Sequence, residues 1–219
     1  MTSQHGFESS LAVYDIIHRL SDESLPLPPL TGTFGCHIVI LTILRGILGF
    51  SKSTLSIEQG VVASRQSFIT TLRRWQEMWE NEPGSVLSPK DARGPILFNS
   101  TAILRLSYIR LVIDYSSVRQ GFSYTDSVED IQHAIESMRP LPRTWEAARA
   151  ALHSLLALRI PVRLGLKLVA RTDFWTWNVQ HALSYFECAL LLASWLGIVS
   201  QLSMSDKNWS LMKIGSIST

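Results

Sequence analysis

Apolar positions recur at helical spacing along most of the chain. Phe68, Leu72, Trp75 and Trp79 fall at i, i+4, i+7 and i+11, which is one face of a helix. Arg73, between them in sequence, falls on another face. The two tryptophans therefore belong to a continuous apolar stripe, and we expect both in a core, with buried partners for their indole N–H groups.

The helix that carries this stripe has recognisable ends. Ser56 followed by Gln59 resembles a capping box, in which two side chains satisfy free backbone N–H groups at a helix start. A Pro-Gly pair stops the pattern, so we expect the helix to end at about Asn81. The segment Asn81–Pro95 is rich in turn residues and is predicted to be a loop.

Further helical patterns follow this loop. The helix that starts at Pro95 is apolar almost all round, and such a helix is normally surrounded by others. Thr144 is predicted to cap the next long helix, and Pro161 to interrupt it. No stretch alternates with period two for long enough to indicate a strand. The sequence predicts an all-α fold, a multi-helix bundle that forms a single and partial domain.

Two apolar segments are candidates for membrane spans, Phe34–Phe50 and Ala182–Leu202. A spanning helix needs about 20 mostly apolar residues. The first segment is shorter and contains His37 and Arg45, and the second contains Glu187. A charge near the bilayer centre costs about 3 kcal/mol. We favour buried core helices and no membrane contact, and a two-span membrane protein built on residues 34–50 and 182–202 is the alternative.

Composition restricts the class of protein. The apolar fraction of 46% suits a globular core, and the net charge of +2 is too small to indicate nucleic-acid binding by itself. Cys36 and Cys188 lie far apart in apolar runs, which predicts two buried free thiols in a reducing compartment. The N-terminal residues lack the basic region and apolar run of a secretory signal, which indicates the cytosol or nucleus.

Motifs for catalysis or metal binding do not occur in the sequence. It has no Gly-rich phosphate loop, no HExxH helix and no GxSxG elbow. Cys36 and His37 are adjacent, and His181 and Cys188 share a helix face, but a structural zinc site needs four ligands, usually in close pairs. We expect no enzyme activity and no cofactor or metal in this chain.

One charge pattern stands out, four basic residues spaced by four. We call these residues the basic ridge: Arg159, Arg163, Lys167 and Arg171. Residues four apart are neighbours on a helix, and no acidic residue occurs between Glu146 and Asp173. Three interpretations stay open. The ridge is a solvated face whose stems cover apolar surface, a contact for an acidic protein or intramolecular segment, or a phosphate contact.

Four blocks, in order along the chain, carry a family resemblance. They are RRWQEMWENEP, GPILFNSTAILRLSYIRLVID, IPVRLGLKLVAR and WNVQHALSYFECALLLASWL. Together they resemble the fungal-specific transcription factor domain, also called the xylanolytic-activator regulatory or middle homology region, of fungal zinc-finger transcription factors. The likeness is greatest to the subgroup with paired C2H2 fingers and runs from about Phe34 to Leu202.

The resemblance implies a helical regulatory domain in the nucleus, without enzyme activity, that takes part in control of RNA polymerase II transcription. The family's zinc ligands lie in its fingers, and this sequence has no CxxC or HxxxH to match them. The chain therefore looks like a fragment that lacks the fingers, and DNA contact is expected only through full-length members. Its expected partners are the transcription machinery or intramolecular regulatory contacts, and homodimerisation is left open.

This interpretation divides the chain into three parts. Residues 1–33 are an N-terminal segment with a Pro-rich linker, residues 34–202 are the regulatory domain, and residues 203–219 are a polar tail. The basic ridge and the Asn81–Pro95 loop are candidate places for regulation. A helical small-molecule-binding protein is a further alternative, because bundles hold ligands between their helices. Four aromatic residues are expected to serve in packing: Trp75, Trp79, Trp177 and Trp195.

Overall fold

The computed structural model describes residues 12–29, 32–53, 58–82, 95–124, 127–165 and 179–200. All regular structure in these residues is helical, and no strand occurs among them, so the predicted all-α class is confirmed. The helices are α1 (Val13–Ser21), α2 (Gly32–Ser53), α3 (Glu58–Glu80), α4 (Pro95–Val112), α5 (Ser116–Tyr124), α6 (Val128–Glu136), α7 (Trp145–Leu164) and α9 (Val179–Ser200).

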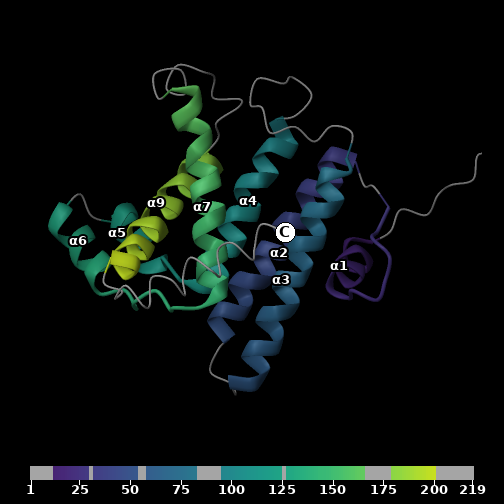
Figure 1. Ribbon diagram of the computed structural model, residues 1–219, viewed down its shortest axis with the longest axis horizontal. Coiled ribbons are helices and arrows are strands. Elements are labelled where there is room, and N and C mark those ends of the chain that lie inside the picture. The colour runs from purple at the N-terminus through teal and green to yellow at the C-terminus, as the bar shows by residue number, and fades with distance from the viewer. Residues whose placement is uncertain are drawn as a thin grey trace, which may run out of the picture.

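Helix α4 is the centre of the bundle. It lies between α7 on one side and the α2–α3 pair on the other, and α9 packs against both α7 and α4 (Figure 1). Its residues from Thr101 to Ile109 are all buried, because neighbours cover the helix on every side. This position explains why its sequence is apolar almost all round. Helices α5 and α6 pair at one end of the molecule, and α1 lies at the other (Figure 1).

The first of two core clusters joins α1, α2, α3 and α4. Trp75 is fully buried in it, and Trp79 is 6% exposed. The indole N–H of Trp75 donates to the backbone carbonyl oxygen of Cys36 on α2 at 3.0 Å. The structure therefore supplies a buried partner for this indole, and the stripe on α3 faces the core.

The second core cluster joins α4 to α7 and α9. Helix α7 presents small buried residues to this cluster, among them Ala147, Ala150 and Ala151, which allow helix backbones to approach closely. Cys188 of α9 is buried here, and Trp195 packs against the cluster while partly exposed. Trp177 lies outside the described residues.

Helix α1 was not predicted from the sequence, although its apolar residues have helical spacing. Ile16 and Leu20 are buried in the first cluster, and Val13 and Ile17 pack against it. The segment before the Pro-rich linker therefore shares its core with α2, α3 and α4.

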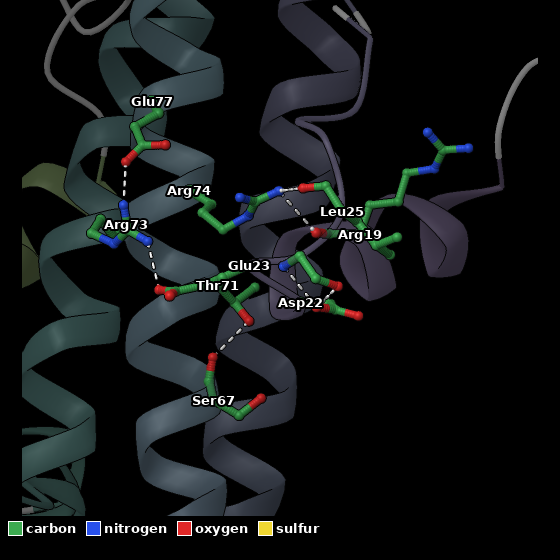
Figure 2. A network of polar contacts seen from close by, with 10 residues as sticks. Arg19, Asp22, Glu23, Leu25, Ser67, Thr71, Arg73, Arg74 and Glu77 are labelled. Atoms are coloured by element: carbon green, nitrogen blue, oxygen red, sulfur yellow. Dashed lines mark hydrogen bonds and ion pairs between the residues drawn. The ribbon is translucent and has the colours of Figure 1, made fainter.

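Polar contacts fasten α1 and the turn after it to α3, and Figure 2 shows them. The Arg74 guanidinium donates to the carbonyl oxygens of Arg19 at 3.2 Å and Leu25 at 2.6 Å. Arg73 pairs with Glu23 at 2.7 Å. The carbonyl groups at the end of α1 and at the start of the linker thus both accept from Arg74, which is buried. The position of α1 and the linker therefore depends on α3.

The helix ends agree only in part with the sequence predictions. The Thr144 hydroxyl accepts from the backbone N–H of Ala147 at 3.3 Å, which confirms it as the cap of α7. The predicted interruption at Pro161 is wrong, because α7 continues to Leu164. Pro161 lacks the N–H that would bond the carbonyl of Ala157, and α7 accommodates the proline in its last turn before Gly165 at φ 87° ends the helix. Ser56 lies outside the described residues.

Candidate functional site

The structure describes two members of the basic ridge, and both lie on α7. Arg159 and Arg163 are exposed and sit one turn apart in the last third of the helix. Within the part of the chain that the structure describes, no carboxylate forms an ion pair with either residue. Lys167 and Arg171 lie outside the described residues.

These two arginines border a hollow, which we call the α3–α7 groove. It is a cavity of about 340 Å³ between α3 and α7, with α4 as its floor. Apolar side chains from all three helices line it, and the residues that matter for its chemistry are Trp79, Leu104, Arg105, Leu156, Arg159 and Arg163. The described half of the ridge is therefore the rim of a cavity.

Arg105 is the unexpected member of this groove. It is only 7% exposed, on the central helix α4. Its Nη1 is buried and has no hydrogen-bond partner among the described residues. Burial lowers the pKa of Arg105, because a charged guanidinium loses water without full compensation. From the sequence Arg105 was only an interruption in an apolar helix, and its spacing gives no sign that it reaches a cavity.

Aromatic and basic groups stack beside Arg105. The His153 ring lies parallel to the Tyr108 ring, with centroids 4.2 Å apart and planes 12° apart. The Arg149 guanidinium carbon lies 5.3 Å from the Tyr108 centroid. Burial, and then repulsion from Arg149 and Arg105, lowers the pKa of His153 to about 3. His153 is therefore neutral at neutral pH and adds no charge to the groove.

A second polar cluster ties three helices together around Glu187 of α9. Glu187 is fully buried and accepts from Nε of Arg110 on α4 at 2.8 Å and from Nη1 of Arg119 on α5 at 2.9 Å. A second bond from Arg110 makes that pair bidentate. Asp114 adds a longer contact to Arg119 at 3.9 Å. The cluster fixes α9 against α4 and α5 and is a structural clamp.

The sequence signalled Glu187 only as a charge inside an apolar segment. Two described helices are long and apolar enough to cross a membrane by length and composition, Gly32–Phe50 and Val179–Ser200. The first supplies the carbonyl partner of Trp75, and the second carries the clamp carboxylate. Both segments therefore take part in helix packing within the bundle.

The cysteines and histidines that the structure describes form no metal-binding cluster. Cys36 and Cys188 are buried free thiols in different core clusters. His181 lies within hydrogen-bonding distance of Asn99, its Nε2 2.9 Å from the amide oxygen, and stacks on Phe98 at 4.5 Å. Among the residues described, no three His, Cys, Asp or Glu side chains come close enough together to hold a metal ion.

Comparison with known families gives a match over part of the chain. Residues 114–214 match the family described as the fungal transcription factor C-terminal domain. This part of the chain is similar to fungal transcription factor C-terminal domains. No curated protein and no solved structure matches the chain.

The match confirms the resemblance to fungal transcription factors over residues 114–214, whereas the predicted resemblance began at about Phe34. The matched residues include α5, α6, α7 and α9, and with them the clamp residues Arg119 and Glu187 and the ridge arginines. The family suggests a regulator of transcription in the nucleus that is not an enzyme. The C2H2 subgroup stays a prediction.

Proposed function

We propose that the chain is a regulatory helical domain of a fungal zinc-finger transcription factor and acts by interaction in the regulation of RNA polymerase II transcription in the nucleus. The observation that carries this proposal is the match of residues 114–214 to the fungal transcription factor C-terminal domain. The partners are the transcription machinery or other segments of the same transcription factor.

The proposal assigns no DNA contact to this domain. Sequence-specific readers place a helix or a strand pair in a DNA groove and contact phosphates along its edges. The described ridge residues Arg159 and Arg163 border a cavity instead, beside apolar Leu156. Such a concave, partly apolar surface suits a small ligand or a single side chain better than a duplex.

A tethering experiment tests the regulatory role. The full chain is fused to an unrelated DNA-binding domain in a fungal cell that carries a reporter with matching sites. We expect reporter transcripts to rise or fall relative to the DNA-binding domain alone. The same fusion with Glu187→Gln should lose the effect, because that substitution breaks the clamp that holds α9. Reporter transcripts that stay at the level of the DNA-binding domain alone, at equal nuclear protein, would contradict the proposal.

Zinc and DNA binding offer a second test. We expect the purified chain to hold no stoichiometric zinc and to select no DNA sequence, because the family's finger ligands have no counterpart in the sequence. Elemental analysis after dialysis against a chelator measures the first, and a selection from random DNA measures the second. One retained zinc per chain, or an enriched motif, would overturn this assignment.

The two-span membrane protein is the alternative that one observation favours. Only 22% of the 18-residue apolar stretch of α9 is buried in the bundle. Val179 and Leu196 of this helix are 80% and 64% exposed. Fractionation of cells that express the full chain distinguishes the two. Recovery without detergent supports the regulatory domain, and recovery only with detergent-solubilised membranes supports the membrane protein.

A further inference from the structure

The α3–α7 groove contains a buried cation that the bundle leaves incompletely satisfied. Nη1 of Arg105 has no hydrogen-bond partner in the described part of the chain, although the residue is only 7% exposed. A buried donor without a partner costs free energy, and a charged one costs more. Arg105 is also one of the residues that line the groove, so an anion that enters the groove meets the charge of this guanidinium.

Charge in the groove favours an anion. Among its described lining residues are three arginines, Arg105, Arg159 and Arg163, and one carboxylate, Glu80, an excess of two positive charges. Glu80 accepts from Gln76 at 2.9 Å. His153, the remaining titratable group of the lining, is neutral because its pKa is lowered to about 3. The fixed charges therefore attract a negative ligand group toward the floor.

The walls of the groove favour an apolar body attached to that anion. Trp79 from α3, Leu104 from α4, and Leu156 and Ile160 from α7 line it. Leu156 is 44% exposed, so apolar surface continues to the mouth. The volume of about 340 Å³ falls at the small end of the range for small-molecule sites, roughly 300–1,000 Å³. The space suits a small organic molecule and is too small for a folded partner.

The number of buried arginines in the groove indicates how many negative charges the ligand carries. Only Arg105 is buried, whereas Arg159 and Arg163 lie in solvent at the rim. A single buried guanidinium can compensate one negative charge, and a doubly charged phosphate would bring a second charge out of water with no buried cation to meet it. A guanidinium also matches the planar geometry of a carboxylate.

We propose that the α3–α7 groove binds a small amphipathic monocarboxylic acid, with the carboxylate on Arg105 and the hydrocarbon body against Trp79, Leu104 and Leu156. Arg159 and Arg163 attract the ligand at the mouth. This proposal concerns binding alone and does not depend on the proposed role in transcription.

Octanoate, below the concentration at which it forms micelles, is a suitable probe for the purified full chain. Isothermal titration should show saturable binding, and thermal unfolding should shift upward because a ligand of the native state stabilises it. Octanol and octylamine, which keep the apolar body and change the head group, should bind at least about tenfold more weakly, since hydrogen bonds to charged groups are the strong ones. Inorganic phosphate alone should not bind.

Two variants make the test specific. Arg105→Met keeps an apolar stem of similar length and removes the buried charge, so it should weaken octanoate binding by about tenfold or more. The unliganded variant should melt at the same temperature as the wild type or higher, because an incompletely satisfied buried charge has been removed. The matched control is Arg139→Met, at an exposed arginine outside the groove, which should bind octanoate like the wild type.

Three outcomes overturn the proposal. The first is octanol or octylamine binding as tightly as octanoate, which would mean that the groove recognises only the apolar body. The second is Arg105→Met and Arg139→Met binding octanoate equally, which would place the ligand elsewhere. The third is phosphate binding as tightly as octanoate, which would make the groove a general anion site. All three are measured on purified protein, so failure here leaves the reporter experiment on transcription unaffected.

Discussion

Glu187 and Arg110 form a buried bidentate ion pair between α9 and α4, with Glu187 fully buried and the Arg110 side chain 8% exposed. Taking charges out of water is unfavourable, and a buried pair stays folded only when each charge keeps its partner. Arg119 adds a third group, 27% exposed, to the same carboxylate. Helix α9, the most apolar of the described helices, is thus held against α4 by its one carboxylate, Glu187.

Substitutions in the clamp should lower the free energy of unfolding by different amounts, more at Glu187 than at Arg119. Glu187→Gln keeps the shape and removes the charge, which leaves the Arg110 guanidinium buried without a counter-ion, so it should lower the free energy of unfolding by about 3–5 kcal/mol. Arg119→Gln should cost less, because Arg119 is partly solvated. Urea unfolding measures both variants.

A double substitution provides the control for this interpretation. Arg110→Met combined with Glu187→Leu removes both charges, so it should be more stable than Glu187→Gln alone. If Glu187→Gln unfolds within about 1 kcal/mol of the wild type, the clamp is not a determinant of the fold.

Trp79 should contribute strongly to stability. It is 6% exposed in the first core cluster, so Trp79→Ala removes a large buried side chain and leaves a cavity. We expect a loss of about 3–5 kcal/mol in the free energy of unfolding. Leu155→Ala, at a residue 56% exposed on α7, is the matched control and should change little. A Trp79→Ala protein that melts within a degree or two of the wild type would place this tryptophan outside the core.

The sequence predicted the helices of the core better than the contacts between them. The spacing of Trp75 and Trp79 was sufficient, because a stripe at helical period reports burial directly. Helix α1 was missed although Ile16 and Leu20 have the same spacing, since a short segment before a Pro-rich stretch resembles a terminal extension. The effect of Pro161 was overestimated, because α7 accommodates the proline within its last turn and continues to Leu164.

The polar residues of the candidate site were the harder problem. Arg105 and Glu187 both interrupt apolar helices in the sequence. In the structure Glu187 bonds two arginines, whereas Arg105 lines a cavity. Nothing in helical periodicity separates these outcomes, because the partners are more than 60 positions away in the sequence for the Glu187 bonds. Only the assembled bundle shows which buried charge is matched.

The rim of the groove should tolerate charge reversal. Arg159 and Arg163 are exposed and have no ion-pair partner in the described part of the chain, so the double variant Arg159→Glu with Arg163→Glu should change the free energy of unfolding by about half a kcal/mol or less. Any binding of an anion to the groove should weaken, and more at low salt, where screening is least. Chemical denaturation checks the first statement. A variant that fails to fold would show that these arginines are structural.

His181 should make the stability of the bundle depend on acid pH. Burial, and then repulsion from Arg105, lowers the pKa of His181 to about 3, whereas an unfolded histidine titrates near 6.5. Between these values the unfolded chain binds a proton that the folded chain does not, so stability falls as the pH falls from about 6.5 toward 3. Above about 6.5 neither state binds the proton, and His181 adds no pH dependence.

His181→Gln tests this linkage, because an amide can still reach Asn99 and does not titrate in this range. A difference of one bound proton between the unfolded and folded states makes the free energy of unfolding change by about 1.4 kcal/mol per pH unit. Between about pH 6 and 4 the slope for the variant should therefore be smaller than that of the wild type by up to this amount. Urea unfolding across that pH series gives the slope for the variant and the wild type. Equal slopes would mean that His181 gains its proton in the folded bundle, with its charged ring then stacked on Phe98.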